Sequence, residues 1–197
     1  MDEPRSQNID RFFVLTGGPG SGKSTLIEAL RQAGYARSIE AGRSIIRDQV
    51  ATDGRALPWS DPLAFAELML AWEIRSYRTA QDCSGPVFFD RGVPDVVGYL
   101  RLLAFPVPGH MQKAAATFRY NRTAFIAPPW REIFTEDRER KQDFNEAVRT
   151  YQSMVETYTE FGYELVEVPR APPEERLSFI LQHVSRLNGP VPSTAAD

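Results

Sequence analysis

An apolar run followed by a glycine-rich stretch is the feature that most constrains how this chain can fold. Residues 12–15 read Phe-Phe-Val-Leu, and residues 17–25 read Gly-Gly-Pro-Gly-Ser-Gly-Lys-Ser-Thr. Leu26, Ile27 and Leu30 then follow at helical spacing. A buried strand, a tight loop and a helix in this order point several backbone N–H groups and the positive end of the helix at one place. The pattern predicts a strand–loop–helix unit that holds an anion.

The residue types in this loop indicate a nucleoside triphosphate, because Gly17-x-x-x-x-Gly22-Lys23-Ser24 is the pattern of a phosphate cradle. We expect Lys23 to reach the β- and γ-phosphates of ATP and the Ser24 hydroxyl to bind Mg²⁺. The alternative, a glycine-rich turn that only joins a strand to a helix, leaves Lys23 and Ser24 unexplained. The predicted nucleotide-binding residues are Gly17, Gly18, Gly20, Ser21, Gly22, Lys23, Ser24 and Thr25.

Composition limits the chain to one globular domain and argues against several functions. The chain has 197 residues, 42% of them hydrophobic, which is enough for one sizeable core. Its 23 basic and 26 acidic residues give a net charge of −3, so we expect no nucleic-acid partner. The single cysteine, Cys83, excludes an internal disulfide framework and a cysteine-rich zinc site.

Nothing in the sequence indicates a membrane segment. No run approaches the roughly eighteen continuous apolar residues that a spanning helix needs, and the first residues lack the apolar region of a signal peptide. We therefore expect no membrane partner and a cytoplasmic location. We expect a flexible arm at 1–10, one domain at 11–187 and a flexible tail at 188–197, since both ends are polar and carry prolines. The oligomeric state is not predicted.

Strand and helix patterns alternate along the whole domain. Strands are expected at 12–16, 36–39, 86–90, 123–127 and 164–168, and helices at 22–33, 42–52, 61–82, 93–103, 109–118, 142–162 and 173–187. This alternation predicts an α/β protein with a five-stranded parallel sheet between helices. With the loop above, the expected class is a three-layer P-loop NTPase of strand order 2-3-1-4-5. In such sheets ligands bind at the carboxyl ends of the strands.

Asp90 ends an apolar strand pattern, Val87 to Phe89, in the manner of a Walker B element. A carboxylate there can hold Mg²⁺ opposite Ser24, because a hard cation prefers oxygen ligands. The alternative is an Asp that caps the next helix. Arg91, directly after it, can clamp a phosphate or part of an acceptor, or can form a structural ion pair with Asp90 or Asp95.

Glu40 follows the second strand pattern, on the side of the sheet where an acceptor is expected. If the acceptor is a hydroxyl, a carboxylate at this point can take or orient its proton. The alternative is that Glu40 caps the helix beginning near Gly42 and pairs with Arg43. Both interpretations stay open.

Two further segments are candidates for contact with substrate. The run at 131–141 is the densest in charge, and within a segment at 128–141 after the fourth strand we expect a lid, with Arg138 and Arg140 over the transferring phosphoryl group. Acid-to-base pairs at i,i+4 in the same run also fit a solvated helix. The long segment at 41–85 is expected to be a helical insertion on the acceptor side. Its aromatic residues could line a pocket or the core: Trp59, Phe65, Trp72 and Tyr77.

Four motifs together resemble a known family. They are the loop at 17–25, Glu-Ala-Gly-Arg at 40–43, Phe-Asp-Arg-Gly at 89–92 and Asp-Arg-Glu-Arg-Lys at 137–141. In this combination the chain looks like the bacterial AAA domain predicted ATPases related to the nicotinamide riboside kinase domain, over about residues 11–187. The plan is more distantly similar to nucleoside and nucleotide kinases such as thymidylate kinase.

The resemblance implies roles for individual residues. It implies phosphate and Mg²⁺ contacts for Lys23, Ser24 and Asp90, an acceptor or phosphate contact for Arg91, and lid positions for Arg138 and Arg140. In deoxynucleoside kinases a glutamate after the second strand is the base, which favours that role for Glu40. The chain departs from thymidylate and adenylate kinases in one respect, because 41–85 contains no copy of their acceptor-recognition pattern, which counts against nucleoside phosphorylation.

Two functions are compatible with these features. The first is a kinase that moves the γ-phosphoryl group of ATP to a hydroxyl or phosphate of a small molecule, with a nucleoside-like acceptor favoured. The second is an ATPase or nucleotide-dependent switch with no small-molecule acceptor. The sequence contains neither an Asn-Lys-x-Asp guanine motif nor a Leu-Ser-Gly-Gly signature. The expected partners are therefore a nucleoside triphosphate and an unidentified small-molecule acceptor.

Overall fold

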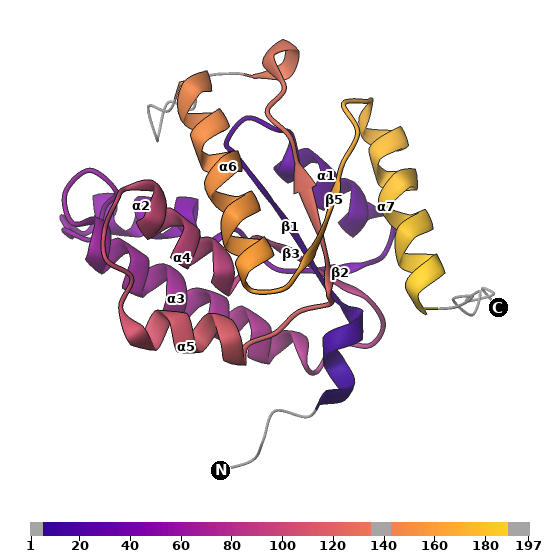
Figure 1. The fold of residues 1–197 in the computed structure, drawn as a ribbon, viewed down its shortest axis with the longest axis horizontal. Helices are drawn as coiled ribbons and strands as arrows, with labels where there is room; N and C mark the ends of the chain where they lie inside the picture. Colours follow the sequence, from indigo (N-terminus) through magenta and orange to yellow (C-terminus); the bar gives the residue numbers. More distant parts are fainter. Residues whose placement is uncertain (1–5, 135–142, 189–197) are drawn as a thin grey trace.

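One parallel sheet lies between two layers of helices in the computed structural model, which describes residues 6–134 and 143–188 (Figure 1). The strands are β1 (Phe12–Gly17), β2 (Ala36–Arg37), β3 (Val87–Asp90), β4 (Thr123–Ala127) and β5 (Glu164–Glu167). Their order is β2-β3-β1-β4-β5, and every neighbouring pair is parallel. The expected fold class and strand order are confirmed.

The helices begin and end within two residues of the predicted positions. They are α1 (Lys23–Gln32), α2 (Ala41–Ala51), α3 (Pro62–Ala80), α4 (Val93–Leu102), α5 (Gly109–Thr117), α6 (Phe144–Glu160) and α7 (Pro173–Asn188). Asp61 caps α3 by accepting a hydrogen bond from the backbone N–H of Ala64, as its place before Pro62 indicates.

Two short 3-10 helices, η1 (Ser6–Arg11) and η2 (Arg131–Ile133), lie where no regular element was expected. The end of η1 is fixed to the loop after α3 by the guanidinium of Arg11. Its Nη1 donates to the carbonyl oxygens of Cys83 at 2.6 Å and Gly85 at 3.1 Å. Carbonyl groups at a helix end lack partners within the helix and need other donors. Sequence periodicity does not reveal that Arg11 supplies them.

The second strand is shorter than predicted because a side chain takes over its hydrogen bonding. The backbone N–H of Ser38 still donates to the carbonyl of Phe88 at 2.9 Å. The next bond in the ladder is replaced, since the N–H of Asp90 donates to the Ser38 hydroxyl at 3.0 Å. The chain is thereby released from the sheet just before Glu40.

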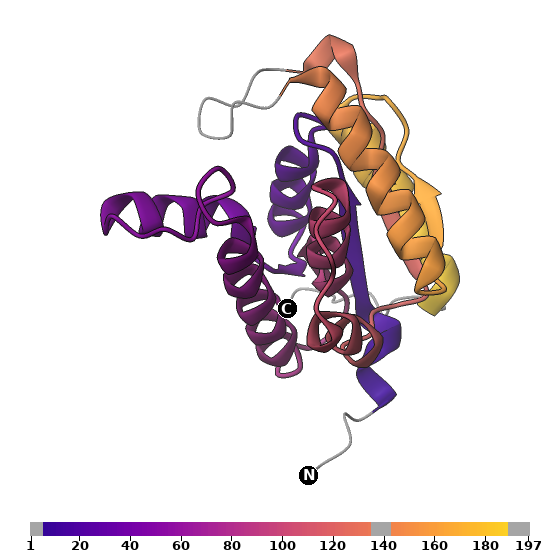
Figure 2. The same ribbon diagram turned by 60° about the vertical axis from the view of Figure 1, so that its left-hand side comes forward.

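The sheet has an apolar cluster on each face, because alternate residues of a strand point to opposite sides. Phe12 and Val14 of β1 pack in a cluster with residues of α3 and α6. Phe13 and Leu15 pack on the other face with residues of α1 and α7. Figure 2 shows α3 in purple at the left and α6 in orange at the right, where the two helices cover different parts of the same face.

Leu30 provides a test of the α1 packing. Its side chain is fully buried in the second cluster, so Leu30→Ala is expected to lower the free energy of unfolding by about 2–5 kcal/mol through lost burial and a residual cavity. Urea denaturation measures the change. Leu187→Ala is the matched control, since Leu187 is 51% exposed and its loss should cost no more than about 0.5 kcal/mol. Equal effects of the two substitutions would contradict the assigned core.

Candidate functional site

Two cavities meet at the carboxyl end of the sheet. The larger, here called the loop cavity, has a volume of about 600 Å³ and is lined by 19–25 of the glycine-rich loop and by residues that follow β3, β4 and β5. The smaller, here called the helix cavity, has a volume of about 240 Å³ and is lined by side chains of α2, α3, α4 and α6. Pro19, Glu40 and Arg91 line both. These three residues therefore form the boundary between the cavities.

The glycines of the loop are required by its backbone. Gly17 has φ 125°, and a Cβ there would lie 2.4 Å from the carbonyl oxygen of Ala127 in β4. Gly22, the residue before α1, has φ 79°, and its Cβ would lie 2.6 Å from Nη1 of Arg176. Residues with a side chain rarely adopt such φ values, and at Gly17 the neighbouring carbonyl of Ala127 is backbone that cannot move aside. The loop can keep this course only with glycine at these positions.

Lys23 lies at the first turn of α1 and is 6% exposed. Its ammonium group donates to the carbonyl oxygen of Gly18 and lies 3.2 Å from the Ser21 hydroxyl. Burial and the nearby positive charge of Arg91 lower the pKa of Lys23 to about 7, against the attraction of Asp90 and Glu40. A bound anion would favour the charged form of this amine.

Asp90 and Ser24 fit a magnesium site beside the loop. Both line the loop cavity, and the buried Oδ1 of Asp90 has no hydrogen-bond partner among the described residues. Burial, and then the neighbouring Glu40, raise the pKa of Asp90 to about 6, so a cation would stabilise its ionised form. Mg²⁺ commonly binds one or two protein oxygen ligands, such as a hydroxyl and a carboxylate, while phosphates and water supply its remaining ligands. Residues 6–134 and 143–188 contain no cluster of three or more His, Cys, Asp and Glu side chains that could hold a metal.

Asp90 is not the cap of the next helix. The residue before α4 is Gly92, and the carboxylate that accepts from its N–H, at 2.9 Å, belongs to Asp95. The capping alternative for Asp90 is therefore wrong, because Asp95 occupies the position three residues into the helix where a capping box needs an acid.

Arg91 is held in a strained conformation by several partners. Its φ of 74° lies in the left-handed region, which costs a non-glycine residue about 1–3 kcal/mol. Its Nη1 donates to the carbonyl of Gly17 at 3.1 Å and to Oδ1 of Asp95 at 3.2 Å, and its Nε lies 3.7 Å from Oε1 of Glu40. Burial opposes the charge, but the carboxylates of Asp95 and Glu40 raise the pKa of Arg91 above its ordinary value. The structural ion pair with Asp95, one of the alternatives for Arg91, is therefore present, and Arg91 also lines both cavities.

Glu40 precedes α2 but makes no side-chain capping bond to it. Of the alternative interpretation of Glu40, the capping of α2 is therefore wrong. The pair with Arg43 is present, because Oε2 of Glu40 lies 3.5 Å from Nε of Arg43. The other carboxylate oxygen faces Arg91. The carboxylate therefore lies where the two cavities join.

Arg176 of α7 belongs to the loop cavity and was not predicted. It is 4% exposed, its Nη2 donates to the carbonyl of Ser21 at 3.1 Å, and burial lowers its pKa. A signal does exist in the sequence, because Arg176 precedes Ile180 and Val184 at four-residue steps and so lies on the apolar stripe of its helix. A charged residue on such a stripe needs a polar partner.

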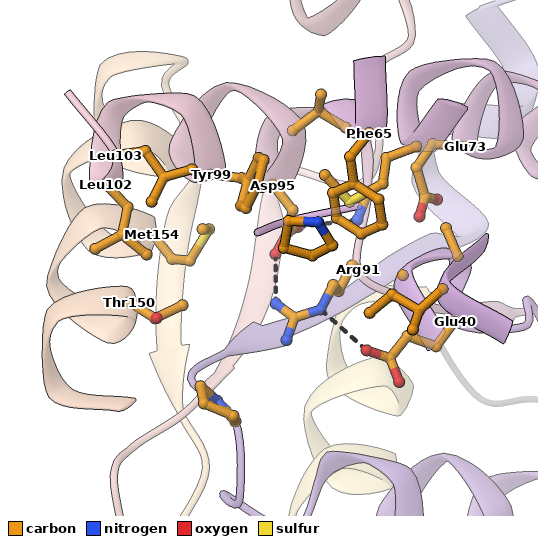
Figure 3. Close-up of a pocket in the computed structure, with 18 of the residues that line it drawn as sticks. Glu40, Phe65, Glu73, Arg91, Asp95, Tyr99, Leu102, Leu103, Thr150 and Met154 are labelled. Carbon is orange, nitrogen blue, oxygen red and sulfur yellow. Dashed lines mark hydrogen bonds and ion pairs between the residues drawn. The ribbon is translucent and has the colours of Figure 1, made fainter. Parts of the chain in front are cut away.

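Glu73 of α3 is a second unpredicted residue with the same signal. It lies on the buried stripe of Ala66, Leu70, Tyr77 and Ala80, is 3% exposed, and lines the helix cavity. Burial raises the pKa of Glu73 well above its ordinary value, and the carboxylates of Asp95 and Asp90 raise it further. Figure 3 shows it in the pocket with Glu40, Arg91 and Asp95.

The remaining candidates divide between the cavities and the core. Trp59 and Phe65 line the helix cavity, whereas Tyr77 lies in the first core cluster and Trp72 donates to the carbonyl of Ile39 at 3.2 Å. Arg170 and Trp130 border the loop cavity. The expected lid residues Arg138 and Arg140 lie outside the described residues. No helix in the described ranges has the length and apolar character to cross a membrane.

Comparison with known proteins gives a family and several structural relatives. The model of a family described as AAA domain matches residues 12–176. No match was found among curated proteins.

Among solved structures, NadR protein in complex with NR has a TM-score of 0.70 and 17% identity and covers 93% of this chain. This chain spans only 52% of that protein. Deoxyadenosine kinase from M. mycoides, with products dCMP and a flexible dCDP bound, has a TM-score of 0.64, 13% identity, and coverage of 89% of this chain and 99% of its own. At these identities the likeness shows a shared P-loop kinase fold.

The buried acid Glu73 generates a prediction about stability. Because its folded-state pKa is raised, its contribution to stability is present at low pH and is lost as the pH rises above 4.5, the ordinary value. Glu73→Gln removes this titration. At about pH 8 the free energy of unfolding of the variant should therefore exceed that of the wild type by about 1 kcal/mol, and the difference should narrow towards pH 4.5. Denaturant unfolding across this range measures the gap. Glu175→Gln, at an exposed position of α7, is the control and should show no such trend.

Proposed function

The chain belongs to the AAA domain family, and we propose that it is a kinase that transfers the γ-phosphoryl group of ATP to a hydroxyl group of a small molecule. The observation that carries this proposal is the pair of cavities that share Pro19, Glu40 and Arg91. Hydrolysis requires only the first cavity, whereas transfer requires a second one that opens onto the phosphates. The structural similarity to NadR with NR and to deoxyadenosine kinase supports a nucleoside-like acceptor.

In this proposal the loop cavity holds the donor. The backbone N–H groups of 17–25 surround the β- and γ-phosphates, and Lys23 moves its ammonium from the Gly18 carbonyl to a phosphate oxygen. Ser24 and Asp90 would hold Mg²⁺, which supplies neutralising charge to the phosphates. Arg170 and Trp130, which line the same cavity, would flank the adenine ring.

The acceptor hydroxyl would approach from the helix cavity. Its oxygen forms a bond to the γ-phosphorus while the bond from that phosphorus to the β–γ bridging oxygen breaks, and ADP leaves. The hydroxyl proton goes to Glu40, and the guanidinium of Arg91 stabilises the negative charge on the transferring group. We keep Arg138 and Arg140 as proposed lid residues that add positive charge over the same group.

Lys23→Ala tests the donor half. Without the ammonium, ATP with Mg²⁺ should bind at least about 100-fold more weakly, because a charge-assisted contact to phosphate is lost. Isothermal titration calorimetry measures the affinity. The exposed Lys113→Ala serves as control and should bind ATP as the wild type does. Unchanged affinity in Lys23→Ala would refute the phosphate site.

A panel of acceptors tests the transfer itself. ADP release from ATP and Mg²⁺ should be slow alone and should accelerate with one pool among nucleosides, nucleotides, vitamins and sugars. Steady release that no pool accelerates would exclude a kinase and would support the ATPase alternative.

With an accelerating acceptor, Glu40→Gln should lower the rate of ADP release by about 100-fold or more, because the proton acceptor is lost. Its melting temperature should change little, since the side chain does not cap α2 and Arg91 keeps its hydrogen bond to Asp95. Glu28→Gln, an exposed acid that pairs with Arg31, is the control and should keep the full rate. A variant Glu40→Gln with full rate would remove Glu40 from the mechanism.

A further inference from the structure

We propose that the helix cavity takes an acceptor that carries no phosphate or carboxylate group, and that Glu73 recognises this acceptor by accepting a hydrogen bond from an N–H or O–H group. This inference rests on the kinase function proposed above and names the class of its acceptor.

The first observation is an unpartnered carboxyl group inside the cavity. Glu73 is 3% exposed, and its Oε2 has no hydrogen-bond partner among the described residues. Figure 3 shows its carboxyl end turned towards Glu40 and Arg91, into the space that the lining side chains enclose. A buried carboxyl group without a partner costs about 1–3 kcal/mol, so in the ligand-free protein this residue weakens the fold. A ligand that donates a hydrogen bond would recover that cost.

A second unpartnered group lies in the same cavity on a different helix. The hydroxyl of Tyr99 in α4 is buried and has no hydrogen-bond partner among the described residues. Its ring packs edge-on against Phe65 of α3, with centroids 5.6 Å apart. The ring is therefore fixed in the wall. Two polar groups that are fixed, buried and unused indicate a site for a polar ligand.

The charge of the lining selects against anions. Four acids line the cavity, namely Glu40, Glu73, Asp95 and Glu146, and Arg91 is the one cation among its described lining residues. The guanidinium of Arg91 is already engaged by Asp95 and lies 3.7 Å from Glu40. A phosphate or carboxylate deep in this cavity would lie beside the carboxylates of Glu40 and Asp95, and such a like-charge contact costs several kcal/mol. It would also lie beside Glu73, where burial already disfavours a negative charge. A neutral or cationic molecule meets no such penalty.

The opposite wall of the cavity is apolar. Leu102, Leu103 and Met154 form this wall, on the side of the cavity away from Glu73 (Figure 3). Phe65 and Met69 of α3 complete the apolar lining. The acceptor therefore needs an apolar or aromatic part for this wall, and a polar group that reaches Glu73.

Substitution at Glu73 tests the inference with two variants. Glu73→Met should raise the melting temperature of the ligand-free protein, because an unpartnered acid is replaced by an apolar side chain of similar length. It should also raise the KM for the accelerating acceptor by about 30-fold or more and leave ATP affinity unchanged. Glu73→Gln keeps an accepting oxygen, so its KM for the acceptor should stay close to that of the wild type. Glu67→Gln is the matched control on the same helix.

The acceptors are tested in matched sets: uncharged nucleosides, nucleosides with a cationic base, and the 5′-monophosphates of both. Acceleration of ADP release by a nucleoside but not by its monophosphate supports the inference, and the first two sets decide between a neutral and a cationic acceptor. Preference for a monophosphate overturns it, as does a KM that is unchanged in Glu73→Met or a lowered melting temperature in that variant. ADP release that none of the sets accelerates is a different result, because it overturns the kinase function itself.

Discussion

The buried carboxylate of Asp95 is the interaction on which the arrangement of the site depends. Four donors converge on it: the hydroxyls of Thr16 at 2.6 Å and Tyr158 at 2.5 Å, the N–H of Gly92 at 2.9 Å, and Nη1 of Arg91 at 3.2 Å. These donors come from β1, from α6 and from the turn that begins α4. A buried charge is tolerated only when it is paired and hydrogen-bonded in this way. The same carboxylate thus joins the sheet to two helices and fixes the arginine between the two cavities.

Much of the fold could be predicted because its signals are local. The apolar run at Phe12–Gly17, the loop that follows it and the three- and four-residue steps of the helices each depend on neighbours in sequence. The parallel order then follows from alternation of strands and helices. The same reasoning placed Lys23, Asp90 and Glu40 at strand ends, and the structure brings all three to one cavity. Their chemical roles stay predictions.

The rest depended on contacts between distant segments. Ser38 shortens β2 because its hydroxyl meets Asp90, 52 positions away. Glu73 has a helical spacing that belongs to the core, and only the packing of α3 against α4 turns that position into the wall of a cavity. Sequence periodicity reports which side of a helix is covered. It does not report whether a neighbouring part of the protein or an empty space covers that side. The acid on an apolar stripe was the sign of Glu73 in the sequence, and Trp59 and Phe65 were the aromatic residues that could line a pocket.

The contact between Arg176 of α7 and the Ser21 carbonyl joins two segments that lie 155 positions apart in the sequence. The glycine-rich loop is synthesised before α7, and α7 supplies one of the groups that support the backbone of the loop. A nascent chain that has folded β1, α1 and β3 therefore still lacks part of the loop's support. A chain that ends before α7 would lack this support even though every residue of the loop is present.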